Sequence, residues 1–314
     1  MIGIDVAKKT LAVCCWEVGQ AQPSWEASYP NTAAGLQELL AAAPATLPWV
    51  VEPTGSYSES VVRAGQAAGR KVLMAPPLAA KRFLQSLTPR AKTDKADARG
   101  LACYGQQARL RPFRLKEAPL QRLWAVLQGR SKLARVLASL RQQQRAFPEL
   151  AFLSAPVVGV MEAQLQAYDR ELERAGRQLE LFRRLLKVPG IGAMNAAGLT
   201  VRLSSIDFPS YDAFIAYVGL DLRVRESGAF RGRRRLSKHG DATLRWLLFM
   251  AARATLVAAQ GTDFQALYER KLAQGFSKTA AACILARKLA KVAWAMARSG
   301  EDYDPTRVFS ARRP

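Results

Sequence analysis

The sequence predicts an α/β amino-terminal region followed by mostly helical regions, and three patterns along the chain indicate this architecture. In about the first hundred residues, short apolar runs alternate with segments of helical spacing, as in a mixed sheet covered by helices. From about Leu120 to Leu186 the chain is rich in Leu, Arg, Gln and Glu, which is typical of long helices. A third region opens at Val188 and continues through helices to Arg298. We therefore expect domains at residues 1–115, 116–182 and 183–314.

The first region reads as strands and helices in alternation. Met1–Asp5 and Leu11–Val18 are β-rich runs joined by a turn at Lys8 and Lys9. Pro48–Glu52 is a short apolar run bounded by proline, as buried strands often are. The remaining expected elements are helices at 33–43, 59–68 and 78–87 and a strand at 71–75. Folds of this kind place their sites in the loops at the carboxyl ends of the strands.

The second region shows a heptad pattern. Leucines recur every seven residues at Leu165, Leu172, Leu179 and Leu186. Such a seam is typical of an antiparallel helical hairpin or a coiled-coil dimer. We expect breaks in these helices near Pro148 and Pro156. A plain helical spacer is the simpler interpretation.

The charge of the chain is its strongest compositional feature. Its 314 residues include 47 Lys and Arg against 25 Asp and Glu, a net charge of +22. An apolar share of 49% indicates a chain that folds, so the charge favours nucleic acid as the partner and an anionic membrane surface second. Apolar runs such as the one from Trp246 to Ala252 are cut by charges before the ~20 residues of a membrane span, so we expect no membrane insertion.

The histidine and cysteine content excludes several kinds of site. The single histidine, His239, excludes a multi-histidine metal site and makes a histidine-based triad improbable. The four cysteines form no CxxC pair, which indicates neither a zinc site nor a disulfide framework. A reducing cytoplasm is the expected location, at the nucleoid.

Four acidic residues are candidate ligands for a metal ion. Asp5 interrupts an apolar strand, Glu52 ends another, and Asp94 and Asp97 are spaced to share one face or the first turn of a helix. If the fold brings them together, their oxygens suit Mg²⁺ or Mn²⁺ and the two-metal chemistry of phosphodiesters. Taken singly, each is more often a solvated surface charge, and Lys92, Lys95 and Arg99 would give a salt-bridged helix face.

The run from Val188 to Gly192, with sequence VPGIG, lies between two helical segments. A tight hairpin there would point backbone N–H groups outward, and Gly190 and Gly192 would let a phosphate approach. This arrangement resembles the helix-hairpin-helix element that binds nucleic-acid backbones, with Lys187 beside it. An ordinary helix–helix turn is the alternative.

The segment Arg223–Arg245 holds eight basic residues against two acids, which suits a groove lined by phosphates better than a solvated loop. The candidate nucleic-acid contacts in it are Arg223, Arg225, Arg231, Arg233, Arg234, Arg235 and Lys238. Ser237 lies inside this cluster and is a candidate nucleophile. It would need activation by a base, for which His239 is the nearby imidazole, or by a metal. A cap or turn is the more ordinary role of such a serine.

Six motifs, in this order and covering nearly the whole chain, resemble the DEDD insertion-sequence transposases of the IS one-ten family, which includes the Piv-type DNA invertases. They are GIDVAKKTLAV, VVEPTGSY, AKTDKADARGLACYG, LKVPGIGAMNAAGL, FIAYVGLDLRVRESG and RRRLSKHGDATLRWLL. Two features depart from the family pattern: the short first strand before Asp5, and Pro53 directly after Glu52, which we expect to affect the turn that aims this acid.

The resemblance implies a RuvC-like, ribonuclease H-like amino-terminal domain, a helical coiled-coil spacer and a carboxyl-terminal transposase domain. It implies that Asp5, Glu52, Asp94 and Asp97 bind Mg²⁺ and that Ser237 forms a covalent link to DNA during cleavage and rejoining. It also implies a noncoding bridge RNA that pairs with donor and target DNA, and a dimer or tetramer. A two-metal hydrolytic junction nuclease and a non-catalytic nucleic-acid-binding protein are the alternatives.

Overall fold

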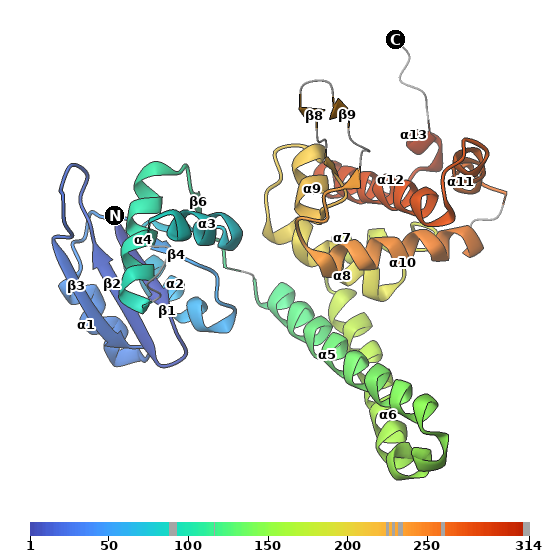
Figure 1. Ribbon diagram of the computed structural model, residues 1–314, viewed down its shortest axis with the longest axis horizontal. Coiled ribbons are helices and arrows are strands. Elements are labelled where there is room, and N and C mark those ends of the chain that lie inside the picture. Colours follow the sequence, from blue (N-terminus) through green and yellow to red (C-terminus); the bar gives the residue numbers. More distant parts are fainter. Residues whose placement is uncertain are drawn as a thin grey trace. The chain divides into compact units, whose positions relative to one another are not determined.

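The computed structural model describes residues 1–87, 93–115, 117–223, 226–227, 230–231, 235–258 and 261–309, with no side-chain description for 56, 87, 226–227 and 230–231. The chain forms two compact units, Met1–Leu115 and Lys116–Pro314 (Figure 1).

The first unit is built on a six-stranded sheet in the order β3-β2-β1-β4-β5-β6. β1 pairs antiparallel with β2, which pairs antiparallel with β3, whereas β4 and β5 continue the sheet parallel to β1 and β6 closes it antiparallel. The strands are β1 (Ile2–Val6), β2 (Thr10–Cys15), β3 (Trp25–Pro30), β4 (Trp49–Val51), β5 (Val72–Met74) and β6 (Arg111–Pro112). The mixed sheet that the sequence predicts is therefore confirmed.

Helices lie on this sheet because its central strands are apolar on both faces. They are α1 (Ala33–Ala42), α2 (Ser56–Ala67), α3 (Pro77–Leu87) and α4 (Asp94–Gln107). Helix α4 covers β1 and β2 through a small buried cluster of Ala12, Cys14, Ala98 and Ala102. On the other face, buried side chains such as Ile4, Val13 and Trp49 form a larger core.

The sequence pattern did not predict the two edge strands, and it predicted that β2 continues beyond its observed end. β3 has the sequence WEASYP and is only partly buried, so its apolar alternation is weak. β6 has two residues, too few to show any period. β2 ends at Cys15 and not at Val18, because Val18 is 83% exposed and lies beyond the paired residues. Edge strands bury one face or none, which removes the signal on which the prediction depends.

Two long helices, α5 (Ala118–Ala146) and α6 (Ala151–Gly176), form an antiparallel hairpin in the second unit (Figure 1). Ion pairs join them at three levels: Arg122 with Glu171, Arg130 with Asp169, and Arg141 with Glu162. A short 3₁₀ turn, η1 (Pro148–Leu150), connects them. The predicted break at Pro148 is thus confirmed.

The expected seam of four leucines was wrong. Helix α6 ends at Gly176, so Leu179 and Leu186 lie outside it and flank the short helix α7 (Glu180–Leu185). The chain bends there because the ring of Phe182 packs on Gly176, where a Cβ atom would lie 2.4 Å from that ring. The break expected at Pro156 was also wrong, because α6 runs through this residue.

The helical stretch Pro148–Gly176 is long and apolar enough to span a membrane by length and composition, with a mean hydropathy of 1.3 in its most apolar window. None of that window is buried in the structure. Because Glu162 and Asp169 of this stretch pair with arginines of α5, we assign it to the hairpin.

The rest of the second unit packs helices around a single apolar core, which also takes in Leu127 of α5 and Leu172 of α6. These helices are α8 (Ala193–Ser205), α9 (Tyr211–Val218), α10 (Ala242–Ala258), α11 (Asp263–Ala273), α12 (Lys278–Ser299) and α13 (Pro305–Phe309). Two-residue strands connect α9 to α10: β7 (Leu222–Arg223) pairs with β10 (Arg235–Leu236), and β8 (Glu226–Ser227) with β9 (Phe230–Arg231). The base of the hairpin therefore shares the core of the helices that follow it.

Candidate functional site

Two of the predicted acids lie near the carboxyl ends of neighbouring strands, Asp5 within β1 and Glu52 directly after β4. β1 and β4 are parallel, and Ile4 lies opposite Val51. Asp5 and Glu52 are the next residues, so they lie level at the carboxyl ends of the two central strands, and both are partly exposed. Because side chains alternate along a strand, Asp5 shares the face of Gly3, against which α4 packs.

Helix α4 brings the other two acids toward the same edge of the sheet. Thr93 caps this helix by accepting a hydrogen bond from the Ala96 N–H group at 3.2 Å, which puts Asp94 and Asp97 in its first turn. Carboxylates are favoured there by the helix dipole. Asp94 is exposed and Asp97 is partly exposed.

The direction of α4 follows from contacts at its far end. Gln106 donates a hydrogen bond to the Trp16 carbonyl at 2.8 Å, and the same carbonyl accepts one from the Met1 amino group at 2.8 Å. The carboxyl end of α4 therefore lies at the start of β1. Its first turn lies toward the other end of that strand, where Asp5 stands.

A salt-bridged face formed by Asp94 and Asp97 with Lys92, Lys95 and Arg99 was the alternative interpretation of these acids. Lys92 lies outside the described residues. Arg99 instead binds Glu26 of β3 through two nitrogens, one of them 2.6 Å from Oε2. The guanidinium of Arg99 lowers the pKa of the Glu26 carboxyl. This ion pair fixes α4 to the edge of the sheet and leaves Arg99 engaged away from the two aspartates.

The four carboxylates match Mg²⁺ by donor type. Within the described ranges of the chain, however, no group of three or more His, Cys, Asp or Glu side chains is arranged to hold a metal ion. The fold thus directs the four acids to one edge of the sheet without gathering them into a ligand shell.

The loop that holds Ser237 rests on the end of α9. The N–H groups of Lys238 and Asp241 donate to the carbonyls of Gly219 and Tyr217, at 3.2 and 2.8 Å. Gly240 must be glycine here, because its φ is 147° and a Cβ atom would lie 2.2 Å from the Tyr217 oxygen. Among the described residues, Lys238 is the one non-glycine residue with positive φ, at 54°. Strained backbone of this kind is often found at functional sites.

Asp221 is a site residue that the sequence reasoning missed. Its carboxylate accepts a hydrogen bond from the Ser237 hydroxyl, and its carbonyl accepts one from the Ser237 N–H group at 2.9 Å. His239, the imidazole expected near the serine, contributes its backbone N–H to Ser237 Oγ at 3.3 Å. Sequence separation hid the pair: the partners are sixteen positions apart, and only the pairing of β7 with β10 brings them together.

A nearly buried ion pair between Arg202 and Asp241 holds the Ser237 loop on the helical core. Arg202 Nε donates to Asp241 Oδ2 at 2.8 Å, and both side chains are nearly buried. Asp241 also caps α10 by accepting a hydrogen bond from the Leu244 N–H group at 2.9 Å. The guanidinium of Arg202 lies 4.0 Å from the ring centroid of Trp124 on α5. The loop is therefore tied to the core and to the hairpin.

Two of the predicted nucleic-acid contacts form a like-charged pair. Arg223 on β7 lies directly opposite Arg235 on β10, and both are exposed. No acidic side chain of the described residues forms an ion pair with either of them. Like charges directly opposite each other destabilise a strand pair unless an anion lies between them. Arg225, Arg233 and Arg234 lie outside the described residues, and Arg231 is described only as backbone of β9.

A tight turn at residues 188–192, where the sequence predicts a helix-hairpin-helix element, joins α7 to α8, and its two glycines differ. Gly190 has φ 82° and faces α10, where a Cβ atom would lie 2.2 Å from Thr255 Oγ1. The Thr255 hydroxyl also donates to the Pro189 carbonyl at 2.9 Å. Gly192 caps α8, and a Cβ atom there would meet nothing within 4 Å. Close packing therefore explains Gly190, and Gly192 is the glycine that a ligand could approach.

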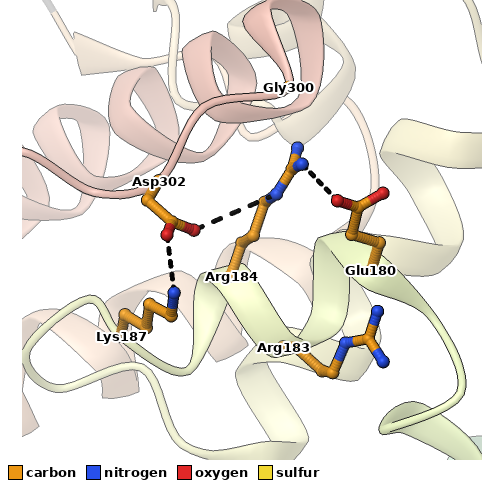
Figure 2. A pocket seen from close by; sticks show the side chains of 6 residues that line it. All are labelled: Glu180, Arg183, Arg184, Lys187, Gly300 and Asp302. Atoms are coloured by element: carbon orange, nitrogen blue, oxygen red, sulfur yellow. Dashed lines mark hydrogen bonds and ion pairs between the residues drawn. The ribbon is translucent and has the colours of Figure 1, made fainter.

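Basic residues of α7 and the following turn line a hollow of about 420 Å³ (Figure 2). Lys187 Nζ lies 2.6 Å from Asp302 Oδ2, and Arg184 Nε lies 3.9 Å from Asp302 Oδ1. Arg184 also pairs with Glu180, whereas Figure 2 draws no ion pair between Arg183 and either acid. The hydrogen bond from Lys187 lowers the pKa of Asp302. Asp302, which follows α12, therefore pairs with the basic side chains beside the turn between α7 and α8.

Known proteins are similar to this sequence over most of its length. A family model described as "Transposase", of the DEDD type, matches residues 2–152, and one described as "Transposase IS116/IS110/IS902 family" matches residues 182–269. The pilin gene-inverting protein of Moraxella bovis is 28% identical, over 96% of this chain and 97% of its own. The transposase for insertion sequence element IS1111A of Coxiella burnetii is 24% identical, over 96% and 91%. The transposase for insertion sequence element IS1328 of Yersinia enterocolitica is 32% identical over 147 residues, which are 45% of this chain and 43% of its own.

Both models and these relatives agree with the resemblance that the motifs indicated. They also make a non-catalytic role untenable, because the models describe transposases. The chain belongs to the IS110-type transposase family and is an enzyme of DNA transposition and recombination.

Proposed function

We propose that this transposase cleaves and rejoins DNA strands through a covalent link between Ser237 Oγ and a DNA phosphate. The observation that supports this most is the Ser237 loop itself. The hydroxyl is partly buried, hydrogen-bonded to the Asp221 carboxylate and held by backbone bonds to the end of α9. A serine in a turn would not need this anchoring, whereas a nucleophile must be fixed and activated.

The position of the two exposed arginines supports DNA as the ligand of this loop. Arg235 is two residues from Ser237 and stands opposite Arg223. A phosphate between them would relieve their repulsion and would lie close to the serine hydroxyl. We therefore assign both arginines to the scissile strand, and we assign Lys238, whose cation is adjacent in the sequence, to the same backbone. We extend this assignment to the DNA backbone to four neighbouring arginines: Arg225, Arg231, Arg233 and Arg234.

We further propose that the edge formed by Asp5, Glu52, Asp94 and Asp97 binds Mg²⁺, or Mn²⁺, when DNA is present. The strand order, with β1 central and α4 crossing it, supports a RuvC-like domain. A divalent cation bound there would supply Lewis-acid activation of the phosphodiester. The residues of the chain direct the acids to this edge and hold α4 against the sheet.

The test is the incubation of purified protein with Mg²⁺, its copurifying RNA and DNA that carries the junction of its element. A protein–DNA adduct on a denaturing gel is expected, and it should disappear in S237A while DNA binding is retained. Each of D5N, E52Q, D94N and D97N should abolish cleavage, as should removal of Mg²⁺ by EDTA. An adduct that persists in S237A would overturn the proposal.

A hydrolytic nuclease is the second candidate, because the acids at the ends of β1 and β4 could act without a serine. It predicts cleavage with no adduct and full activity of S237A. The two candidates therefore separate on one gel.

We extend the proposal to a noncoding bridge RNA that pairs with donor and target DNA. The net charge of +22 supports a partner with more phosphates than one DNA site, and Lys187 and Gly192 would contact a backbone without reading bases. RNase treatment of the purified protein should abolish strand exchange, and the cognate RNA should restore it. Exchange that survives RNase would remove RNA from the proposal. We place this activity at the nucleoid, where the DNA substrate lies.

We also propose that the chain acts as a dimer or tetramer. Large apolar side chains are exposed at the tip of the α5–α6 hairpin: Phe147, Leu150, Phe152, Leu153, Val157 and Val160. An exposed apolar patch of this kind marks an interaction site. Light scattering should give a multiple of 34.5 kDa, and F152E together with L153E should lower it to the monomer mass. A monomeric wild-type protein would contradict this assignment.

A further inference from the structure

We propose that Asp221 is the general base that activates Ser237, an inference that rests on the serine mechanism proposed above. The Ser237 hydroxyl donates its hydrogen bond to Asp221 Oδ1, so the proton already points at the carboxylate. The two residues are fixed independently of that bond, because the Ser237 N–H group donates to the Asp221 carbonyl at 2.9 Å. If the Asp221 side chain only filled space, this backbone pairing with Ser237 would not be needed.

The other candidate base is less well placed. His239 is exposed, and its contact with Ser237 Oγ is made by the backbone N–H group at 3.3 Å, which donates to the oxygen and cannot accept its proton. That N–H group would instead stabilise negative charge developing on Oγ. The two contacts therefore have different roles. The carboxylate of Asp221 accepts the proton, and the backbone N–H group of His239 stabilises the negative charge on the oxygen.

The step balances within these groups and the DNA. The proton of Ser237 moves to Asp221, the Oγ–P bond forms, and the bond from phosphorus to the leaving strand oxygen breaks. That oxygen departs with the electron pair and takes a proton from water. In rejoining, a strand hydroxyl attacks the same phosphorus and gives its proton to the hydroxide that the cleavage step left in the solvent. The Oγ–P bond breaks, and Ser237 recovers its proton from Asp221. A general base of this kind contributes about 10²–10⁴-fold to a rate.

The experiment uses D221N, which keeps the size of the side chain and the backbone bond but removes the base. Adduct formation with junction DNA should fall about 100-fold or more, while DNA binding and the unfolding temperature match those of the wild type. D212N removes an exposed aspartate from the first turn of α9 and should leave the rate unchanged. A D221N rate within threefold of the wild type would overturn the inference.

A second measurement needs neither metal, RNA nor DNA. A fluorophosphonate reagent labels activated serines, and peptide mass spectrometry would locate the label on Ser237. Labelling should be lost in S237A and slowed about 100-fold in D221N, whose rate should rise with pH as hydroxide replaces the base. The charged or titratable groups at this loop include Arg223, Arg235, Lys238, His239, Asp241 and Arg245. Cys283 interacts electrostatically with Lys238, so H239Q and C283A are profiled alongside. Equal labelling of D221N and wild type would overturn the role of Asp221 alone, whereas an adduct that persists in S237A would overturn the serine mechanism.

Discussion

Gly3 of β1 and Ala98 of α4 are in backbone contact, so that a Cβ atom at residue 3 would lie 2.1 Å from the Ala98 carbonyl oxygen and 2.4 Å from the Ala102 nitrogen. Through this contact, the helix that bears Asp94 and Asp97 packs directly on the strand that bears Asp5. The contact between this strand residue and this helix residue therefore sets how closely the proposed metal ligands can approach.

Gly3→Ala tests the close packing of α4 on β1. Because the atoms that the new methyl group meets are backbone, the helix must move, and we expect a loss of about 1–3 kcal/mol in the free energy of unfolding. Mg²⁺-dependent cleavage should fall further than stability does, since α4 would shift away from Asp5. Urea unfolding and the adduct assay measure the two effects.

Gly159→Ala is the control for this substitution, because a Cβ atom in the middle of α6 would meet nothing within 4 Å. It should be neutral or slightly stabilising, by up to about 1 kcal/mol from helix propensity. Equal stability of the Gly3→Ala protein and the wild type would show that the seat of α4 is looser than the contact implies.

The two glycines of the hairpin should respond oppositely to alanine. Gly190→Ala adds a clash with Thr255 at positive φ, and we expect a loss of more than about 2 kcal/mol of stability. Gly192→Ala meets no atom, so its stability should stay within about 1 kcal/mol of the wild type. If a phosphate approaches Gly192, nucleic-acid affinity should fall several-fold in this variant alone. Filter binding at two salt concentrations would detect it, and unchanged affinity would argue for an ordinary helix–helix turn.

Asp302 should compete with nucleic acid for Lys187. The pKa of its carboxyl is lowered by the hydrogen bond from Lys187, so Asp302 stays ionised at and below neutral pH and the pair breaks only under strongly acidic conditions. D302N should therefore tighten nucleic-acid binding two- to threefold and steepen its dependence on salt by about one counterion.

D304N is the matched control, because Asp304 binds Thr306 in the same segment and not Lys187. Binding curves of the two variants in 50 to 200 mM salt would show the difference. Identical curves for D302N and the wild type would exclude Lys187 as a nucleic-acid contact.

The thiol of Cys14 should make the first unit sensitive to alkali. Burial against α4, followed by the charge of Glu26, raises the pKa of Cys14 to about 12 from its ordinary value of 9.0. The folded state therefore holds the proton more tightly, and its contribution to stability is complete below pH 9 and is lost as pH rises toward 12. At pH 10.5 the loss attributable to this group is about 2 kcal/mol.

Cys14→Ala separates this thiol from other groups that titrate in alkali. The free energy of unfolding in urea at pH 8 and 10.5 should fall less in the variant than in the wild type. A fall of the same size in both proteins would mean that Cys14 ionises without cost in the folded state.

The strands and helices of the first unit follow from local patterns where an element is apolar enough to be buried. β1, β4 and β5 are short apolar runs that the sequence marks clearly, and the mixed sheet with helices on it was expected. β3 and β6 were not, because strands at an edge bury too little for their pattern to show. The seam through Leu179 and Leu186 failed for a different reason: the packing of Phe182 on Gly176 bends the chain where the period alone would continue it.

For the candidate site, the sequence indicated which residue types are present but not the distances between their side chains. A carboxylate ending an apolar strand, glycines in a tight turn and a dense run of arginines are costly or unusual in sequence, so Asp5, Glu52, Gly192 and Ser237 could be named without coordinates. Asp221 could not, because an aspartate in a loop is ordinary until the pairing of β7 with β10 puts it against Ser237. Sequence determined which chemical groups this transposase has. Tertiary structure alone decided which of them meet, because such contacts depend on strand register and close packing between residues far apart in the chain.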